Sequence, residues 1–280
     1  MDIGVYMFPT DYAIRIDELA VEAEQRGFES LWVPEHTHIP TSRQTPFPAG
    51  GELPEEYSHT IDPFVGLAAA ATRTDRIKLA TGICLLSERD TIITAKEVAS
   101  LDTLCGGRFV FGIGGGWNRE ELENHGTTFE TRFKRLEEQI EALKRIWTEA
   151  EAEYHGRYID FDPIWSWPKP VQKPHPPILM GGGTNSARQR VVDFCDGWLP
   201  IGIAHDVAAG MKDLAERARA AGKRPEDFPV SIFGAPPDPD TLKQYAELGV
   251  ARVNFWVPPE PTEKVLPILD QYAQVLQKGG

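Results

Sequence analysis

The chain has 280 residues, 41% of them hydrophobic, so it can bury a sizeable core in one large domain or two smaller ones. Its 29 lysines and arginines against 42 acidic residues give a formal charge of -13, which argues against nucleic acid and anionic membranes as partners, because both require a positive surface. Three widely spaced cysteines, the lack of a basic leader and the lack of an apolar run of ~18 residues predict buried free thiols, no membrane span and a cytoplasmic protein.

The first half of the sequence alternates short apolar segments, typical of buried strands, with segments of helical periodicity. Strands are expected over residues 2–8, 28–33, 77–86 (interrupted at Thr81-Gly82) and 109–113. One helix is expected to begin at Ile16 and to end at Gly27. Further helices are expected from Asp62-Pro63 to Thr72, over 92–104 and along residues 133–147. Between the second strand and the second helix lies a loop rich in proline and glycine, from Ile39 to about Ile61, whose length is typical of a functional lid.

The second half repeats the alternation after an irregular excursion from Glu153 to about Pro177, which carries short strands and a proline-rich return. Strands are then expected over 178–180, 197–201, 230–233 and 252–257. The helices between them include one capped by Asn185 or Ser186, one that ends at Gly222, and one over 240–248. A last helix carries apolar residues at helical spacing from Val265 to Leu276.

Eight strands that alternate with eight helices predict a parallel sheet closed into a single α/β domain, a (β/α)8 TIM barrel over residues 1–280. It would carry a long loop after strand two and the excursion before strand five. A doubly wound sheet is the alternative. That fold needs a phosphate-binding turn after the first strand, where Phe8-Pro9-Thr10 has no glycine.

The expected strand ends are rich in glycine and small or aromatic residues, and in a barrel these ends form the active-site face. Glycine lets backbone approach a ligand closely, and Trp117 could cover a flat ring. The alternative is a set of tight turns with Trp117 in the core. The pattern favours an apolar slot for a planar heteroaromatic cofactor. The candidate cofactor-binding residues are Thr81, Gly82, Ile83, Gly114, Gly115, Gly116, Trp117, Asn118, Gly181, Gly182 and Gly183.

Strand two ends in Glu35 and His36, which point to opposite sides of an extended segment. An imidazole at the barrel mouth can exchange a proton near neutral pH, so these two are the candidate catalytic residues; the alternative is a polar surface loop. His36 and His38 could share a metal ion, but no other strand end completes the ligand set, so we expect no metal site.

Two further expectations concern the loops. The glycine turn 181–183, the helix that follows it and Arg188 could hold a phosphate group, although a plain turn explains them equally well. The loops could also line a substrate pocket, or simply pack on the barrel. The candidate lining residues are Pro46, Phe47, Trp165 and Trp167, and the histidines expected in solvent are His125, His155, His175 and His205.

Five segments together resemble the bacterial luciferase-like superfamily of flavin and deazaflavin oxidoreductases, most closely its actinobacterial branch of coenzyme F420-dependent oxidoreductases. They span nearly the whole chain and are more specific for the superfamily than for the cofactor. The segments are residues 30–36 (SLWVPEH), 78–83 (KLATGI), 101–109 (LDTLCGGRF), 112–121 (GIGGGWNREE) and 167–170 (WPKP) followed by the glycines 181–183.

The resemblance implies a (β/α)8 barrel with the cofactor ring over the strand ends, a non-proline cis peptide at Gly82-Ile83, and His36 as the proton donor. It also implies a small-molecule substrate and allows for a homodimer. The family more often has Asp where this chain has Glu35. One dehydrogenase group has a catalytic Glu where Trp117 stands and an insertion between strands seven and eight that looks absent here, which argues against a sugar-phosphate dehydrogenase.

Three functions are compatible with this pattern. The first is hydride transfer between reduced F420 and a small organic substrate, with the cofactor supplying the chemistry. The second is a monooxygenase that uses reduced FMN and oxygen, because deazaflavin does not readily activate oxygen. The third is a barrel that binds flavin or deazaflavin without catalysis, which the lack of an acidic residue at position 117 favours.

Overall fold

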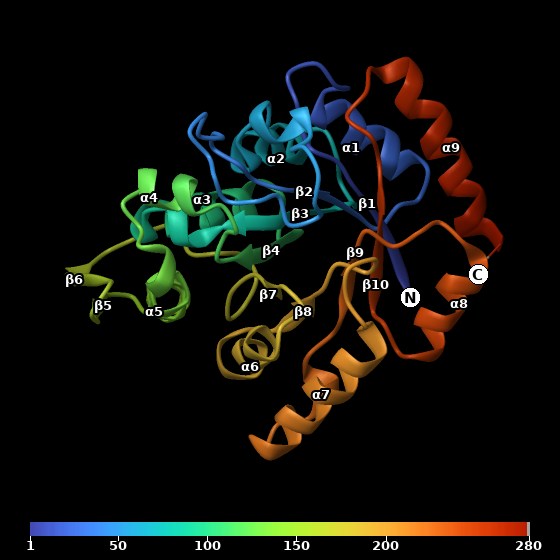
Figure 1. The fold of residues 1–280 in the computed structure, drawn as a ribbon. Helices are drawn as coiled ribbons and strands as arrows, with labels where there is room; N and C mark the ends of the chain where they lie inside the picture. Colours follow the sequence, from blue (N-terminus) through green and yellow to red (C-terminus); the bar gives the residue numbers. More distant parts are fainter. Residues whose placement is uncertain (279–280) are drawn as a thin grey trace.

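Eight parallel strands form one continuous sheet in a computed structural model of the chain, which describes residues 1–278 (Figure 1). The sheet order is β8-β7-β4-β3-β2-β1-β10-β9, and two parallel bridges, Trp198 to Val230 and Ile201 to Phe233, join its two edges and close the barrel. The strands are β1 (Asp2–Tyr6), β2 (Ser30–Val33), β3 (Lys78–Leu85), β4 (Phe109–Gly114), β7 (Ile178–Gly181), β8 (Gly197–Leu199), β9 (Ser231–Phe233) and β10 (Arg252–Trp256).

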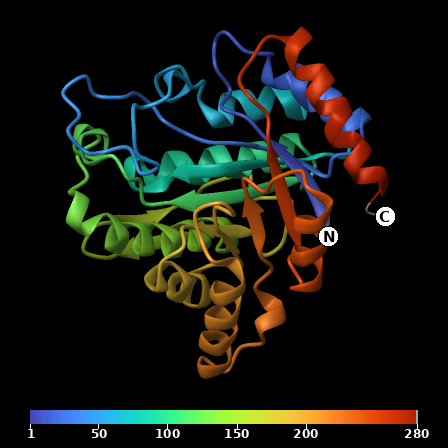
Figure 2. The same ribbon diagram turned by 45° about the vertical axis from the view of Figure 1, so that its right-hand side comes forward.

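The helices cover the outside of this barrel, and the last one lies beside the first (Figures 1 and 2). Each buries its apolar stripe against the strands, as Leu136, Ile140 and Leu143 of α5 do. No helix among the described residues is both long and apolar enough to cross a bilayer. The helices that follow the strands are α1 (Ile16–Gln25), α2 (Pro63–Ala71), α3 (Thr91–Leu104), α5 (Arg132–Thr148), α6 (Asn185–Phe194), α7 (Val207–Ala220), α8 (Pro239–Glu247) and α9 (Thr262–Lys278).

The helix starts confirm one sequence prediction, correct another and add one helix. Asp62 caps α2 by accepting from the backbone N–H groups of Phe64 and Val65, with proline in the first turn. The cap of α6 is Thr184, whose hydroxyl accepts from Ala187 N–H, so the prediction of Asn185 or Ser186 was wrong. A short helix, α4 (Arg119–Asn124), follows β4 in a segment for which the sequence analysis predicts no element.

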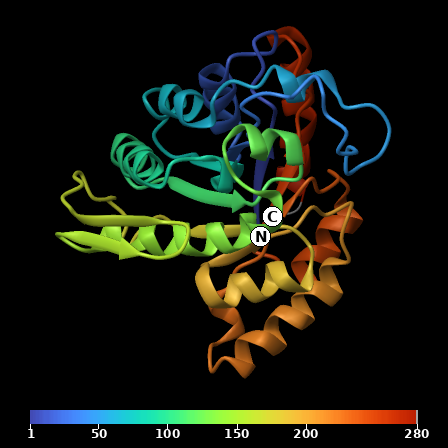
Figure 3. The ribbon, with the colours of Figure 1, turned by 60° about the vertical axis from the view of Figure 1, so that its left-hand side comes forward.

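The excursion before β7 is an antiparallel hairpin of β5 (Ala152–His155) and β6 (Asp160–Ile164). Figure 3 shows this hairpin beside α5, at the opposite end of the molecule from the loop that follows β2. Trp165 and Trp167 at its base are 79% and 61% exposed, and Lys96 of α3 donates to the backbone oxygen of Trp167. Of the two alternatives for these tryptophans, the structure favours packing of the excursion on the outside of the barrel, beside α3.

The face where the strands begin is closed by charge pairs. Glu29 accepts from Nε and Nη2 of Arg252 at 2.6 Å each and lies 2.7 Å from Nζ of Lys78, so it ties β2, β3 and β10 together. A cavity of about 210 Å³ lies at this face, next to Lys78, Arg108 and Arg252. It is at the wrong end of the strands for an active site of this fold, and its cations already bind Glu29 or backbone carbonyls.

Candidate active site

The predicted glycine-lined strand ends do converge, and they meet at Ile83. A Cβ atom on Gly114 would lie 2.1 Å from Cδ1 of Ile83, and one on Gly181 would lie 3.1 Å from its Cγ2. Gly82, on the other side, would clash with Phe233 of β9. The peptide bond Gly82-Ile83 is cis, as the family resemblance implied. The ends of β3, β4, β7 and β9 therefore share one barrel mouth.

These glycines also have a packing role, which the sequence did not indicate. Protein side chains, rather than open space, occupy the positions where their Cβ atoms would stand: Ile83 at Gly114 and Gly181, Phe133 at Gly115, and His205 at Gly183. Gly116 and Gly182 have φ values of +73° and +104°, a conformation that favours glycine. The glycines thus permit tight packing of the wall around the mouth.

The candidate cofactor-binding residues fall into two groups. Ile83, Gly116, Trp117, Gly182 and Gly183 are partly exposed at the mouth. Thr81, Gly82, Gly114, Gly115, Asn118 and Gly181 are buried. The Thr81 hydroxyl donates to the carbonyl of Gly112 at 2.7 Å, and Nδ2 of Asn118 lies 3.5 Å from Oε2 of Glu121, whereas the buried Oδ1 of Asn118 has no partner among the described residues.

Aromatic side chains form one side of the mouth. Trp117 lies edge-on to His36, with ring centroids 5.9 Å apart, and contacts Phe47 and Tyr57 of the loop that follows β2. Tyr57 also lies 5.0 Å from the His36 ring, and burial raises its pKa to about 12. Phe47, a candidate lining residue of the substrate pocket, contacts Tyr57 and Trp117, and these rings pack the long loop over the mouth.

His36 is buried and is held by a carboxylate that the sequence analysis did not assign to the site. Its Nδ1 lies 2.8 Å from Oε2 of Glu121, and the two side chains are 6% and 0% exposed. Glu121 stands in α4, whose first turn places it under the end of β2. Because Nδ1 is engaged, Nε2 is the ring nitrogen left for a substrate.

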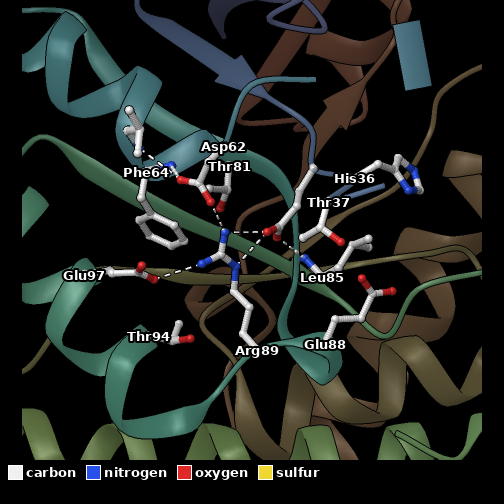
Figure 4. A network of polar contacts seen from close by, with 12 residues as sticks. His36, Thr37, Asp62, Phe64, Thr81, Leu85, Glu88, Arg89, Thr94 and Glu97 are labelled. Atoms are coloured by element: carbon white, nitrogen blue, oxygen red, sulfur yellow. Dashed lines mark hydrogen bonds and ion pairs between the residues drawn. The ribbon is translucent and has the colours of Figure 1, made fainter. Parts of the chain in front are cut away.

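Glu35 points the other way, as the extended backbone predicts. Its carboxylate accepts from the backbone N–H of Leu85 and from Nε of Arg89, each at 2.7 Å. Arg89 also pairs with Asp62 and Glu97, so one guanidinium links Glu35 to the start of α2 and the middle of α3 (Figure 4). In that view the His36 ring points away from Arg89.

Glu88, at the end of the 3-10 turn η2 (Leu86–Glu88), is a further buried carboxyl group, which feels the charges of Glu121 and Glu35. Its side chain is 1% exposed, and neither of its oxygens has a hydrogen-bond partner among the described residues. Burial, and then the negative charges of Glu121 and Glu35, raise its pKa to about 9. No sequence signal marks it, because a polar run after a strand reads as surface turn.

Other sequence expectations about polar residues are corrected or left without support. Arg188 is 8% exposed and its guanidinium binds Asp213, the carbonyl of Gly183 and the side chain of Asn185, so it holds the glycine turn instead of offering a phosphate site. His175, expected in solvent, has a side chain only 7% exposed. His155 is exposed as predicted. Among the described residues no three His, Cys, Asp or Glu side chains are placed to hold a metal, and the three cysteines are free and buried.

Comparison with known proteins shows the family to which the chain belongs. A family model described as luciferase-like monooxygenase matches residues 8–244. The chain belongs to the luciferase-like monooxygenase family. An uncharacterized protein of Mycobacterium tuberculosis is 39% identical over 281 residues, 99% of each chain. The FMNH2-dependent dimethylsulfone monooxygenase of Pseudomonas putida is 30% identical over 209 residues, 73% of this chain and 53% of that protein.

Solved structures share the fold of this luciferase-like chain at low sequence identity. The monooxygenase RslO1 from Streptomyces bottropensis aligns with a TM-score of 0.82 and 20% identity over 99% of both chains. An F420-dependent secondary alcohol dehydrogenase in complex with an F420-acetone adduct aligns with a TM-score of 0.77 and 17% identity, over 100% of this chain and 99% of that one. These matches show the barrel fold alone, and the family assignment comes from the family model. Members of the family are oxidoreductases, and this is the class of reaction that membership indicates.

Proposed function

We propose that this luciferase-like protein transfers a hydride between reduced coenzyme F420 and a small organic substrate, with His36 as the proton donor or acceptor. The observation that carries the proposal is the buried pair of His36 and Glu121 at an aromatic barrel mouth. F420-dependent proteins are also found among the structures with this fold. The bound cofactor would supply the hydride chemistry.

The mouth has the features that a planar ring system requires. Ile83, Trp117 and the glycines 182 and 183 are partly exposed there, and we assign them to contact with the ring. The rings of Trp117 and Tyr57 would exclude water from one side. His36 would move a proton at Nε2 while Glu121 holds Nδ1. Glu35 would act as a positioning residue, since its carboxylate is bound to Arg89 and Leu85 N–H.

A second candidate is a monooxygenase that uses reduced FMN and oxygen. The relative from Pseudomonas putida, 30% identical over 73% of this chain, carries that cofactor in its name. The same mouth and the same His36 would serve this reaction, because both cofactors present a flat tricyclic ring. Which of the two cofactors the protein binds therefore distinguishes the two candidate functions.

The test is a pair of titrations of the purified protein, one with F420 and one with FMN, in the oxidised and reduced forms. The proposal expects F420 to bind with a dissociation constant below about 100 μM and more tightly than FMN. Tighter binding of FMN would favour the monooxygenase. Binding of neither below that level would overturn both candidates, and tight F420 binding without turnover on a panel of alcohols, alkenes and imines would indicate a non-catalytic binding barrel.

A matched pair of variants tests the role of His36. We expect His36→Ala to bind the cofactor as the wild type does while kcat falls by about 10²- to 10⁴-fold, the usual contribution of a general acid or base. His155→Ala, on the exposed hairpin, should change neither quantity. Unchanged turnover in His36→Ala would remove His36 from the mechanism.

A further inference from the structure

Aromatic rings form an arc on the half of the mouth that lies across the barrel from the glycine wall at the ends of β3, β4 and β7. Three of them end β1, β10 and β9, one follows β1, and one stands in the loop after β2. Each ring contacts the next, with centroids between 3.9 Å and 6.0 Å apart. In order, the rings of this aromatic arc are Tyr57, Phe8, Trp256, Tyr6 and Phe233.

Two rings of the arc form the floor of the mouth. Tyr6 and Phe233 are partly exposed and, with Ile83, pack on the buried apolar cluster that fills the barrel interior. All three lie toward the carboxyl ends of their strands. A Cβ atom on Gly82 would lie 2.5 Å from Cε2 of Phe233. The aromatic arc therefore runs from the edge of the glycine wall to His36, which contacts its other end with ring centroids 5.0 Å apart.

The Tyr6 hydroxyl has no hydrogen-bond partner among the described residues. The Tyr272 hydroxyl, by contrast, donates to a backbone oxygen of β10 at 2.8 Å. A Cβ atom on Gly234 would lie 3.2 Å from the Tyr6 hydroxyl oxygen, so the absence of a side chain there leaves this oxygen uncovered. Burial, with the nearby Tyr57 as the second cause, raises the pKa of Tyr6, so its hydroxyl keeps its proton. The floor of the mouth thus offers a donor to a bound molecule.

The aromatic arc carries no charged side chain, and cations near the mouth already have partners. Arg43, whose guanidinium carbon lies 5.8 Å from the centroid of the Trp117 ring, donates to a backbone carbonyl. Arg89 pairs with three carboxylates. The carboxyl group beside His36 is that of Glu121. An anionic molecule would lose its water here without gaining a partner, whereas an apolar ring would cover the arc.

We propose that the aromatic arc is the substrate subsite, that it takes an uncharged, ring-shaped molecule with one hydrogen-bond acceptor, and that the Tyr6 hydroxyl donates to this acceptor. The body of the substrate packs on the arc, while the cofactor ring lies toward the glycine wall. Tyr6 is then a specificity-determining residue, since it touches the substrate. The place of the cofactor rests on the function proposed above, but the affinity of the arc for such molecules does not.

Ligand-detected NMR titrations with molecules of one shape test this proposal, on the protein without cofactor and with whichever cofactor binds. Acetophenone has a phenyl ring and a carbonyl acceptor, α-methylstyrene has a methylene group in place of that oxygen, and benzoate carries a negative charge. We expect benzoate to bind about tenfold or more weakly than acetophenone. Equal binding of these two, or no binding of acetophenone at millimolar concentration in either state, would overturn the proposal.

Tyr6→Phe separates the hydrogen bond from the packing. Removal of the hydroxyl should weaken acetophenone about fivefold, the usual net value of a neutral hydrogen bond, and leave α-methylstyrene unchanged. Tyr158→Phe, in the turn between β5 and β6, should change neither. An equal change for both molecules would overturn the role given to Tyr6, as would a loss of acetophenone affinity in Tyr57→Phe but not in Tyr6→Phe.

Trp256→Leu tests the place of binding. It removes one ring of the aromatic arc and should weaken acetophenone and α-methylstyrene alike, by about tenfold. Unchanged binding of both would place these molecules elsewhere and overturn the subsite. The measurements need no turnover, so failure of the titrations with F420 and FMN would leave a positive result standing. Tight F420 binding without binding of acetophenone would refute the subsite and leave the proposed function intact.

Discussion

Nδ1 of His36 lies 2.8 Å from Oε2 of Glu121, a contact that joins the end of β2 to α4 across 85 residues of sequence. Both side chains are almost fully buried, so water does not compete for the bond. A carboxylate on one ring nitrogen fixes the tautomer and the orientation of an imidazole, and so directs the other nitrogen. The pair fixes Nε2 as the ring nitrogen that gives or takes a proton at the mouth, instead of leaving His36 a mobile side chain.

Replacing Glu121 by Gln should therefore damage catalysis more than binding. The amide keeps the shape of the side chain but can donate to Nδ1. The ring proton would then stand on Nε2 instead of Nδ1, and the negative charge beside the ring would be lost. We expect kcat to fall by about tenfold or more, less than in His36→Ala, with cofactor affinity unchanged. The ¹⁵N shifts of the His36 ring should report the change of tautomer. Glu123→Gln on the same helix is the control, and an unaltered His36 spectrum in Glu121→Gln would refute the orienting role.

The alternation of apolar segments with helical periodicity predicted the barrel, because each strand and each helix carries its own pattern. The converging glycines and His36 were also accessible, since the ends of parallel strands meet at one face. Glu121 was not, because its role depends on a six-residue helix that brings it to His36. Glu88 and Arg89 lie in a polar run that reads as surface, and only the packing of η2 against α5 and β4 buries them.

Replacing the buried Arg89 should lower the stability of the protein strongly. Its guanidinium is 11% exposed, and Glu35, which it neutralises, is 2% exposed. Arg89→Met leaves that carboxylate buried and unpaired, a change that costs about 3–5 kcal/mol in the free energy of unfolding. Arg15→Ala, which breaks a pair on a guanidinium 77% exposed, should cost about 0.5 kcal/mol or less. Urea denaturation compares the two variants. Equal losses in the free energy of unfolding would show that Arg89 stabilises the fold no more than an exposed arginine does.

Acid should weaken the barrel at the face where the strands begin. Burial acts to raise the pKa of Glu29, but hydrogen bonds and charge from Arg252, with help from Lys78, outweigh it and lower the pKa from 4.5 to about 2. A carboxyl group with a depressed pKa stabilises the fold fully above its unfolded value, and this stability is lost as the pH falls from 4.5 toward 2. The contribution is roughly 3 kcal/mol.

Glu29→Gln tests this directly. We expect the variant to be less stable than the wild type at pH 7 and to lose less stability between pH 5 and pH 2, as measured by urea denaturation at each pH. Glu153→Gln, at a carboxylate 53% exposed on the hairpin, should follow the wild-type curve. Parallel curves of stability against pH for Glu29→Gln and the wild type would show that protonation of Glu29 does not weaken the fold.

Two glycines of β4 should respond very differently to alanine. A Cβ on Gly112 would lie 2.1 Å from the backbone oxygen of Thr81, which cannot move without breaking the β3–β4 pairing. A Cβ on Gly114 would lie equally close to Cδ1 of Ile83, but this is the end of a flexible side chain. We expect Gly112→Ala to cost about 3 kcal/mol or more and Gly114→Ala about 1 kcal/mol, by urea denaturation.

Gly114→Ala should nevertheless affect the site. Ile83 is partly exposed at the mouth, so a methyl group behind it would push its side chain into the space that we assign to the cofactor ring. We expect weaker cofactor binding in a protein that is still folded. Shortening the obstructing side chain, in the double variant Ile83→Ala with Gly114→Ala, should restore part of the affinity relative to Gly114→Ala alone. If the double variant binds no better, Ile83 does not couple the glycine wall to the cofactor.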